Sequence, residues 1–391
     1  MNEWKCVIVG GGHAGLHAAK TVWQSGTADR PVRVTVIDKQ PYHVRKVLLF
    51  RPAVGDEPIA VPWEAILPDG VRYVRGEAVS VESEAKRLLY RDAEGNERWM
   101  EYDALIWAAG SVVNRPNPGQ GGIALTDPEA AASIRERWCE NVRKAALETD
   151  PAERGRLLTV AVAGAGISGI ETSAELAHRM RQEAESLGLS PDAVRIYLLN
   201  AQDRLFSEGP AKVAHKLERL LAECGVTVLH RKKALREHAG QLMLEDGRTM
   251  PVGLCVWTLG LSPNPMLSRI GLPLTPQGQI AVDSCYRVPG MPFVYGIGDC
   301  AHIVDPISGR ADRMTCKEGI AQASRLGKIV QADREGRPAP SHKGVFDFFC
   351  IGLGPNRGLT WTRKWGLDFV ITGKLAWSIK TFVWDRASML R

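Results

Sequence analysis

Two apolar runs near the start of the chain are separated by a glycine-rich turn. The first run, Cys6 to Val9, leads into Gly10-Gly11-Gly12-His13-Ala14-Gly15, and a segment with helical spacing follows from Leu16. The second run, Val32 to Ile37, alternates apolar and polar positions and ends at Asp38. A strand, a tight glycine turn, a helix and a strand ending in an acid bind a dinucleotide, with the pyrophosphate at the helix N-terminus and the ribose at the acid. The pattern therefore predicts a dinucleotide site.

The same pattern recurs near the middle of the chain. An apolar run from Leu158 to Ala163 precedes Gly164-Ala165-Gly166-Ile167-Ser168-Gly169, and after a helical segment a further strand ends at Asn200. An acid at that last position would repel the 2′-phosphate of NADPH, whereas Asn200 is neutral and Arg204 lies four residues further on. The preference between NADH and NADPH stays open. Two such units predict a protein that holds two dinucleotides.

Three later runs are predicted to be strands that end in small residues, which let a cofactor approach the backbone closely. They are Asp103 to Gly110, Leu254 to Gly260 and Phe293 to Ala301, and the first two are alike enough to indicate an internal duplication. The residues that we expect to bind the cofactors are Gly10, Gly12, His13, Ala14, Gly15, Asp38, Lys39, Ala109, Gly110, Gly164, Gly166, Ile167, Ser168, Gly169, Asn200, Gly260, Gly298, Asp299 and Ala301.

The C-terminal stretch from Gly373 has the spacing of an amphipathic helix. One face carries Leu375, Ile379, Phe382, Val383, Met389 and Leu390, with Arg386 within it. Trp377 and Trp384 lie opposite, near Lys380 and Arg391. We expect the apolar face to pack on the protein body and the tryptophan-bearing, basic face to meet lipid headgroups. A helix buried at a dimer interface or against the core is the alternative.

Composition narrows the class of protein. The chain has 391 residues, 45% of them hydrophobic and 24% charged, which suits two or three soluble domains. No apolar run approaches 18 residues, and the first strand begins too early for a leader segment, so we expect a cytoplasmic protein. The net charge is +6, and residues 343–391 hold eight basic and three acidic residues, a local excess of +5. Nothing in the pattern indicates a nucleic-acid partner.

The eight cysteines are scattered, and none forms a C-x-x-C or C-x-x-x-x-C pair. A flavin disulfide reductase needs a dithiol beside the flavin, and zinc or iron-sulfur sites need clustered ligands. We therefore expect no metal site. A meeting of Cys139 and Cys350 in space is the alternative that the spacing leaves open.

With these motifs in this order, together with Gly169-Ile170-Glu171 and Ala174-Glu175-Leu176, the chain resembles the type II NADH dehydrogenases, single-subunit NAD(P)H:quinone oxidoreductases with FAD. The resemblance implies that the first glycine turn, Asp38 and Asp299 hold FAD and that Ala301 and His302 lie near the flavin ring. It implies that the second turn holds NAD(P)H and that Glu171 lies where NAD(P)H meets the flavin. For Glu171 and Glu175 the alternative is a structural role, since carboxylates stabilise a helix N-terminal turn.

The quinone-site pattern of that family is half kept. Ala321-Gln322 is present, but Gly327 stands where a second Gln or Glu is expected. Glu171 and Gln322 are the candidate catalytic residues. Quinone, or another small electron acceptor, is the expected partner, along with an anionic membrane surface on the inner face of the cell membrane and a second copy in a homodimer.

The resemblance implies an α/β fold with two Rossmann-like, glutathione-reductase-like domains and a small C-terminal region. We expect residues 1–115 and 281–335 to bind FAD, residues 116–280 to bind NAD(P)H, and residues 336–391 to form a membrane-surface or dimerisation region. The implied reaction passes hydride from NAD(P)H to flavin and two electrons to quinone, without proton pumping. The alternatives are a sulfide:quinone reductase, a soluble ferredoxin-type reductase and a redox-sensing flavoprotein.

Overall fold

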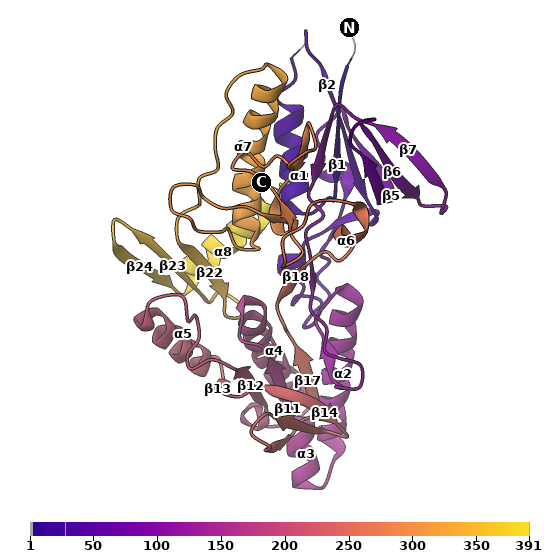
Figure 1. The fold of residues 1–391 in the computed structure, drawn as a ribbon. Helices are drawn as coiled ribbons and strands as arrows, with labels where there is room; N and C mark the ends of the chain where they lie inside the picture. The colour runs from indigo at the N-terminus through magenta and orange to yellow at the C-terminus, as the bar shows by residue number, and fades with distance from the viewer. Residues whose placement is uncertain (1–2, 28, 391) are drawn as a thin grey trace.

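The computed structural model describes residues 3–27 and 29–390, and Figure 1 shows its fold. Expectations that involve Met1 at the start of the chain and Arg391 in the basic tail lie outside the described residues.

The first of two large sheets has seven strands in the order β20-β8-β1-β2-β5-β6-β7. The strands are β1 (Trp4–Val9), β2 (Val32–Asp38), β5 (Val71–Glu82), β6 (Arg87–Asp92), β7 (Glu97–Glu101), β8 (Ala104–Trp107) and β20 (Val294–Gly296). Helix α1 (His13–Trp23) connects β1 to β2, which pair in parallel with Val9 opposite Ile37. Because both strands end at the same edge, the glycine turn and Asp38 meet there.

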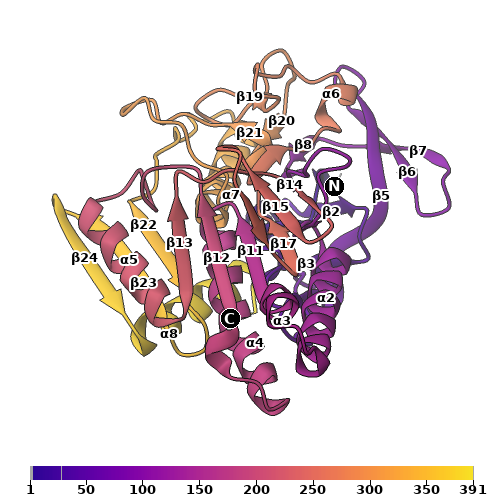
Figure 2. The same ribbon diagram turned by 90° about the horizontal axis from the view of Figure 1, so that it is seen from below.

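The second sheet has five parallel strands in the order β10-β17-β11-β12-β13, seen from below in Figure 2. They are β10 (Ile123–Ala124), β11 (Thr159–Ala163), β12 (Arg195–Asn200), β13 (Val226–His230) and β17 (Leu254–Trp257). Helix α4 (Ile167–Ser186) connects β11 to β12 as α1 connects β1 to β2. The predicted α/β fold with two such units is confirmed.

Shorter elements complete the fold. The helices are α2 (Pro128–Leu147), α3 (Pro151–Leu157), α5 (Ala211–Glu223), α6 (Leu267–Ile270), α7 (Cys316–Arg334) and α8 (Lys374–Ala387), with 3-10 turns η1 (Lys46–Leu48), η2 (Trp63–Ala65), η3 (Pro191–Ala193) and η4 (Gly298–Cys300). The other strands are β3 (Tyr42–Val44), β4 (Ala60–Pro62), β9 (Ser111–Val113), β14 (Ala234–His238), β15 (Gln241–Leu244), β16 (Thr249–Pro251), β18 (Leu261–Pro263), β19 (Ile280–Ala281), β21 (Ala301–His302), β22 (Phe348–Gly352), β23 (Gly358–Lys364) and β24 (Leu367–Thr372).

The two sheets are joined where β9 and β18 pair antiparallel, one strand on the way out of the first sheet and one on the way back. The expected domain boundary at residues 115 and 116 falls between β9 and β10, and that at 280 and 281 falls within β19. The assignment of the units to FAD and NAD(P)H remains a prediction.

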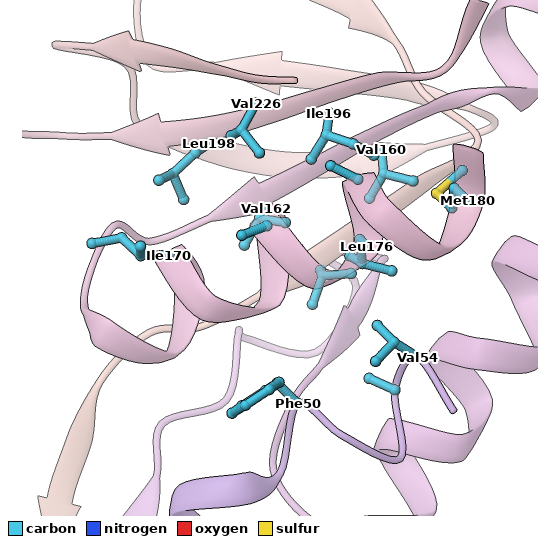
Figure 3. Close-up of a cluster of buried hydrophobic side chains, with 14 of the residues drawn as sticks. Phe50, Val54, Val160, Val162, Ile170, Leu176, Met180, Ile196, Leu198 and Val226 are labelled. Atoms are coloured by element: carbon cyan, nitrogen blue, oxygen red, sulfur yellow. The ribbon is translucent and has the colours of Figure 1, made fainter. Parts of the chain in front are cut away.

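Helix α4 lies between the second sheet and a loop of the first unit. Figure 3 shows its side chains Leu176 and Met180 among strand residues such as Val160, while Phe50 and Val54 approach from the opposite side. All five side chains are almost fully buried. One hydrophobic core therefore fixes the loop at residues 50–54 against the second dinucleotide unit.

The C-terminal region contains a three-stranded antiparallel sheet, β22-β23-β24, which the sequence pattern did not reveal, and helix α8 packs against it. The helix itself was expected, but its predicted orientation is wrong. Trp384 and Lys380 are 5% and 7% exposed, whereas Leu375 and Phe382 are 61% and 47% exposed. The face with the tryptophans and Lys380 packs inward, because Lys380 has a carboxylate and a carbonyl partner there. Leu375, Phe382 and Leu390 of the apolar stripe face outward.

Candidate functional site

The first glycine turn is a tight bend whose open side is free for a ligand. Gly10 has φ +100°, and a Cβ there would overlap the carbonyl oxygen of Ala108, while a Cβ on Gly15 would overlap that of Gly10. Gly12, at the N-cap of α1, has no neighbour within 4 Å of the position of a Cβ. The packed glycines allow the bend, and Gly12 leaves space at the helix N-terminus that a pyrophosphate can fill.

The second turn repeats this arrangement. Gly164 has φ +117°, and its Cβ would overlap the carbonyl oxygen of Thr258; a Cβ on Gly169 would overlap that of Gly164. Gly166 again has open space and caps α4, whose first residues Ile167 and Ser168 are exposed. Two turns of the same geometry support two dinucleotides.

Asp38 lies at the end of β2, as expected, with both oxygens hydrogen-bonded to the backbone. Oδ2 accepts from Gly11 N at 2.6 Å and Oδ1 from Gln40 N at 2.8 Å, and Lys39 is exposed beside it. His13, the first residue of α1, has a buried Nε2 without a hydrogen-bond partner. Burial, with a smaller contribution from His43, holds the pKa of His13 well below its usual range. A neutral imidazole with an unpaired nitrogen beside an open turn is suited to a cofactor contact.

Asp299 lies in η4 opposite α1. Its Oδ2 accepts from Ser111 Oγ at 2.6 Å, and burial raises the pKa of its carboxyl. A Cβ on Gly298, which has φ +73°, would approach Ala14 Cβ to 2.8 Å, so this turn lies directly against the first turn of α1. These residues, with the exposed Gly12 and the unpaired His13, match the requirements of FAD. Gly110 and Gly260 have φ of +67° and +81° in the turns after β8 and β17, and Ala109 Cα lies 3.0 Å from the position of a Cβ on Gly10. Ala301 is buried at the start of β21.

Gln322 is buried in α7, and both ends of its amide are engaged. Its Oε1 accepts from Gly298 N at 2.7 Å and its Nε2 donates to Asp312 Oδ2 at 2.8 Å. The side chain therefore holds the turn that carries Asp299, and its expected contact with quinone remains a prediction.

Gly327, which departs from the family pattern, has a packing explanation. Helices α1 and α7 lie side by side (Figure 1), and a Cβ on Gly327 would come within 3.0 Å of Thr21 Cβ and 3.1 Å of Thr21 O. Thr21 Oγ1 also donates to Ala323 O at 2.9 Å. A Gln or Glu at position 327 would require the two helices to separate.

Arg204 follows the strand end where we expect the adenosine ribose of NAD(P)H, but its guanidinium is engaged by the protein. It donates to the carbonyls of Ser207 and Gly209 and so stabilises this loop. Asn200 is buried and contacts His230 Nδ1 through its Nδ2 at 3.0 Å; His230 Nε2 lies 3.3 Å from Glu218 Oε1. Asn200 thus stays in a fixed orientation at the strand end.

Glu171 forms a buried ion pair that the sequence did not reveal. Lys380 Nζ lies 2.8 Å from Glu171 Oε1, which also accepts from Gly352 N at 2.8 Å. Lys380 Nζ further donates to Cys350 O at 2.9 Å. Burial lowers the pKa of Lys380, but Glu171, Cys350 and Cys316 together outweigh burial, so the pKa is raised. Helix α8 is tied in this way to the helix that begins at the second glycine turn.

The same ion pair completes the free edge of β22. The Cys350 carbonyl and the Gly352 amide point away from β23, and Lys380 and Glu171 satisfy them. Lys317 Nζ, from the start of α7, donates to Phe348 O on this edge at 3.2 Å. One turn along α4, Glu175 is buried, and burial raises its pKa although Arg51 lies 3.9 Å away. No sequence periodicity identifies these partners, because they come from elements far apart in the chain.

The cysteines form no disulfide. All eight cysteines are free thiols, and in residues 3–27 and 29–390 no group of His, Cys, Asp and Glu side chains could hold a metal ion. None of the helices in these residues combines the length and apolar character needed to cross a bilayer.

Comparisons with known proteins agree with this arrangement. A family model described as pyridine nucleotide-disulphide oxidoreductase matches residues 4–332. The NADH dehydrogenase-like protein YutJ of Bacillus subtilis is 26% identical over 348 residues, 88% of this chain and 87% of YutJ. The type II NADH:quinone oxidoreductase NdhA of Mycobacterium tuberculosis is 28% identical over 371 residues, 89% of this chain and 76% of NdhA.

Solved structures share the fold. The structure of NDH2 from Plasmodium falciparum in complex with NADH has a TM-score of 0.82 at 16% identity, covering 100% of this chain and 96% of that one. The sulfide:quinone oxidoreductase of Aquifex aeolicus has a TM-score of 0.76 at 17% identity, covering 99% and 93%. At these identities the likeness concerns the fold alone.

The two glycine turns make a paired test possible. Valine at Gly166 or Gly12 fills space that is open in the protein, so both variants should fold with little change in thermal stability. We expect Gly166→Val to abolish nicotinamide binding and keep FAD, and Gly12→Val to purify without FAD. Flavin absorbance per chain and titration with NADH measure both effects. Loss of both ligands in the Gly166→Val variant would contradict the assignment of the second turn.

Proposed function

The chain belongs to the pyridine nucleotide-disulphide oxidoreductase family, and we propose that it is an FAD-dependent oxidoreductase that passes hydride from NAD(P)H to flavin and two electrons to a quinone. The observation that carries this function is the pair of glycine turns of equal geometry in one chain, one facing Asp38 and Asp299 and one at the start of the helix that bears Glu171. Relatives named as type II NADH:quinone oxidoreductases and a demethylphylloquinone reductase support quinone as the acceptor.

The chemistry that FAD supplies when bound is the acceptance of a hydride from the nicotinamide and the release of two electrons to the acceptor. The protein's contribution is binding and orientation. Gly12 and Gly166 leave room for the two pyrophosphates, and Ser111 holds Asp299 in the turn that lies against the first turn of α1. Because both turns belong to one chain, they would hold the two cofactors in a fixed relation, and the hydride step would need no separate acid or base.

Quinone reduction consumes two protons, and Glu171 is the carboxyl that we assign to one of them. Both of its fixed contacts, to Lys380 and Gly352, use Oε1, which leaves Oε2 for the proton. Lys380 keeps the carboxylate oriented and at the same time satisfies its buried charge. Glu171, ionised in this pair, takes up a proton from water at Oε2 and passes it to the acceptor, so it serves as a proton relay.

The purified full chain should contain FAD without a covalent bond, and the heat-released chromophore should match FAD in chromatography. Under anaerobic conditions NADH should be oxidised with equal molar reduction of a short-chain quinone. Finding FMN, or no flavin in a folded protein, would contradict the proposed function. Oxidation of NADH with no acceptor reduced would favour the redox-sensing alternative.

The role of Glu171 is testable because its ion pair can be removed as a unit. Glu171→Gln and Lys380→Met should each destabilise the protein by about 3–5 kcal/mol, since each leaves one buried charge alone, whereas the double variant should recover most of this loss. Variants without Glu171 should reduce flavin with NADH within about twofold of the original rate but reduce quinone about a hundredfold more slowly. Stopped-flow traces of the two half-reactions measure this split. If the quinone step is slowed in Lys380→Met but not in Glu171→Gln, the proton is assigned to Lys380 instead.

The outward stripe of α8 is the surface that we propose meets the membrane. Leu375, Phe382 and Leu390 are exposed, and Lys374 and Arg386 lie exposed along the same helix. An amphipathic helix with this arrangement binds in the headgroup region, and each basic residue contributes about 1 kcal/mol near an anionic surface. The location that follows is peripheral, on the inner face of the cell membrane. The same stripe in a homodimer interface is the competing arrangement.

Membrane docking can be tested by co-sedimentation with vesicles that contain anionic lipid. The full chain should sediment at low salt and less so at high salt. Leu375→Gln with Phe382→Gln should lower binding at least tenfold, because each apolar side chain contributes about 1.5–3 kcal/mol when buried. Leu147→Gln, an exposed leucine at the end of α2, is the matched control. A double variant that stays bound as before, or that only dissociates a dimer, would contradict membrane docking.

A further inference from the structure

Lys46 is a basic residue of the first unit to which the sequence assigned no role. It is the first residue of η1, in the connection that follows Asp38 and β3. The backbone on both sides of it is fixed: Arg45 N donates to Ile59 O at 2.9 Å, and Leu48 and Leu49 are buried. Arg45 also donates to Ser388 Oγ at 3.0 Å and to Asp385 Oδ1 at 2.9 Å. The position of Lys46 is therefore determined by the fold.

Its ammonium group is only partly satisfied by the protein. Nζ donates to Ser111 O at 3.2 Å, and in residues 3–27 and 29–390 no carboxylate lies within 4.0 Å of it. The side chain is accessible to solvent, yet desolvation by the surrounding protein lowers its pKa. An ammonium group has three donors, so two remain for a ligand. A solvent-accessible cation with donors to spare is suited to an anionic ligand.

The neighbours of Lys46 are the residues that line the expected path of FAD. Ser111, whose carbonyl it contacts, donates through Oγ to Asp299. Asp38 and Asp299 partly offset the lowering of the pKa of Lys46 by burial, and Lys46 in turn helps to lower the pKa of the His13 imidazole. These residues come from the end of β2, from η4 and from the first turn of α1. Lys46 thus lies among the groups from three separate elements that face the cofactor.

We propose that the ammonium group of Lys46 contacts an anionic group of bound FAD. This inference rests on the proposed function, because it requires FAD in the first unit. FAD brings negative charge in two places: its diphosphate, and its ring when the ring accepts a hydride. The carboxylates of Asp38 and Asp299 add to this negative charge, and Lys46 offsets it. A hydrogen bond to a charged group of this kind contributes more than a neutral one.

The experiment compares the FAD-loaded full chain with Lys46→Gln, Lys46→Arg and a control, Lys20→Gln, which removes an exposed lysine on the last turn of α1. The FAD dissociation constant is measured from the rise of flavin fluorescence on dilution. The midpoint potential of the bound flavin is measured by dye equilibration. We expect Lys46→Gln to raise the dissociation constant about tenfold, with Lys46→Arg closer to the original protein and Lys20→Gln unchanged.

The two readouts also tell which anionic group Lys46 contacts. If Lys46 contacts the diphosphate, the Lys46→Gln variant binds oxidised and reduced FAD equally more weakly, so the potential stays the same. If Lys46 contacts the ring, the variant loses more affinity for reduced FAD, and a tenfold difference between the two forms lowers the potential by about 30 mV. A folded Lys46→Gln variant with unchanged affinity and potential overturns the inference. An original protein that never binds FAD overturns the proposed function instead, which keeps the two failures distinct.

Discussion

The buried contact between Glu171 and Lys380 connects three parts of the molecule that are far apart in sequence. Glu171 belongs to the helix that begins at the second glycine turn, Lys380 to the C-terminal helix, and the backbone groups of Cys350 and Gly352 to the edge of β22. Each charge would be costly to bury alone, and together with the two backbone groups they satisfy one another. The C-terminal region is held against the helix of the second dinucleotide unit through this contact.

Helix α8 extends this connection to the first unit. Its last residues contact α1 and the segment before η1: His17 Nε2 donates to Ala387 O at 3.0 Å, and Arg45 pairs with Asp385. The helix therefore contacts the second dinucleotide unit through Lys380 and the first through its end. Its outer residues Leu375 and Phe382 stay exposed while its other face joins the two units.

The sequence predicted the parts of the fold that depend on local geometry. Gly10 and Gly164 occupy backbone conformations that favour glycine, and their spacing to Gly15 and Gly169 reflects contacts within a few residues. The orientation of α8 failed for the opposite reason. The helical pattern predicts that the stripe with leucines is buried. The carboxylate of Glu171, which makes burial of Lys380 favourable, lies on another helix and cannot be seen in that pattern. From the sequence, Gly327 likewise indicates only the loss of an expected polar residue, and its close packing against Thr21 is visible only in the structure.

The central claim is that this body holds a nicotinamide directly against a flavin ring. Rapid anaerobic mixing of the FAD-loaded protein with NADH, followed by full absorbance spectra, tests it most directly. The account predicts a transient absorbance band at long wavelength, from stacking of the nicotinamide on the flavin, as the flavin absorbance falls. Reduction of the flavin without such a band at any NADH concentration would contradict a stacked arrangement, and no reduction at all would contradict the account as a whole.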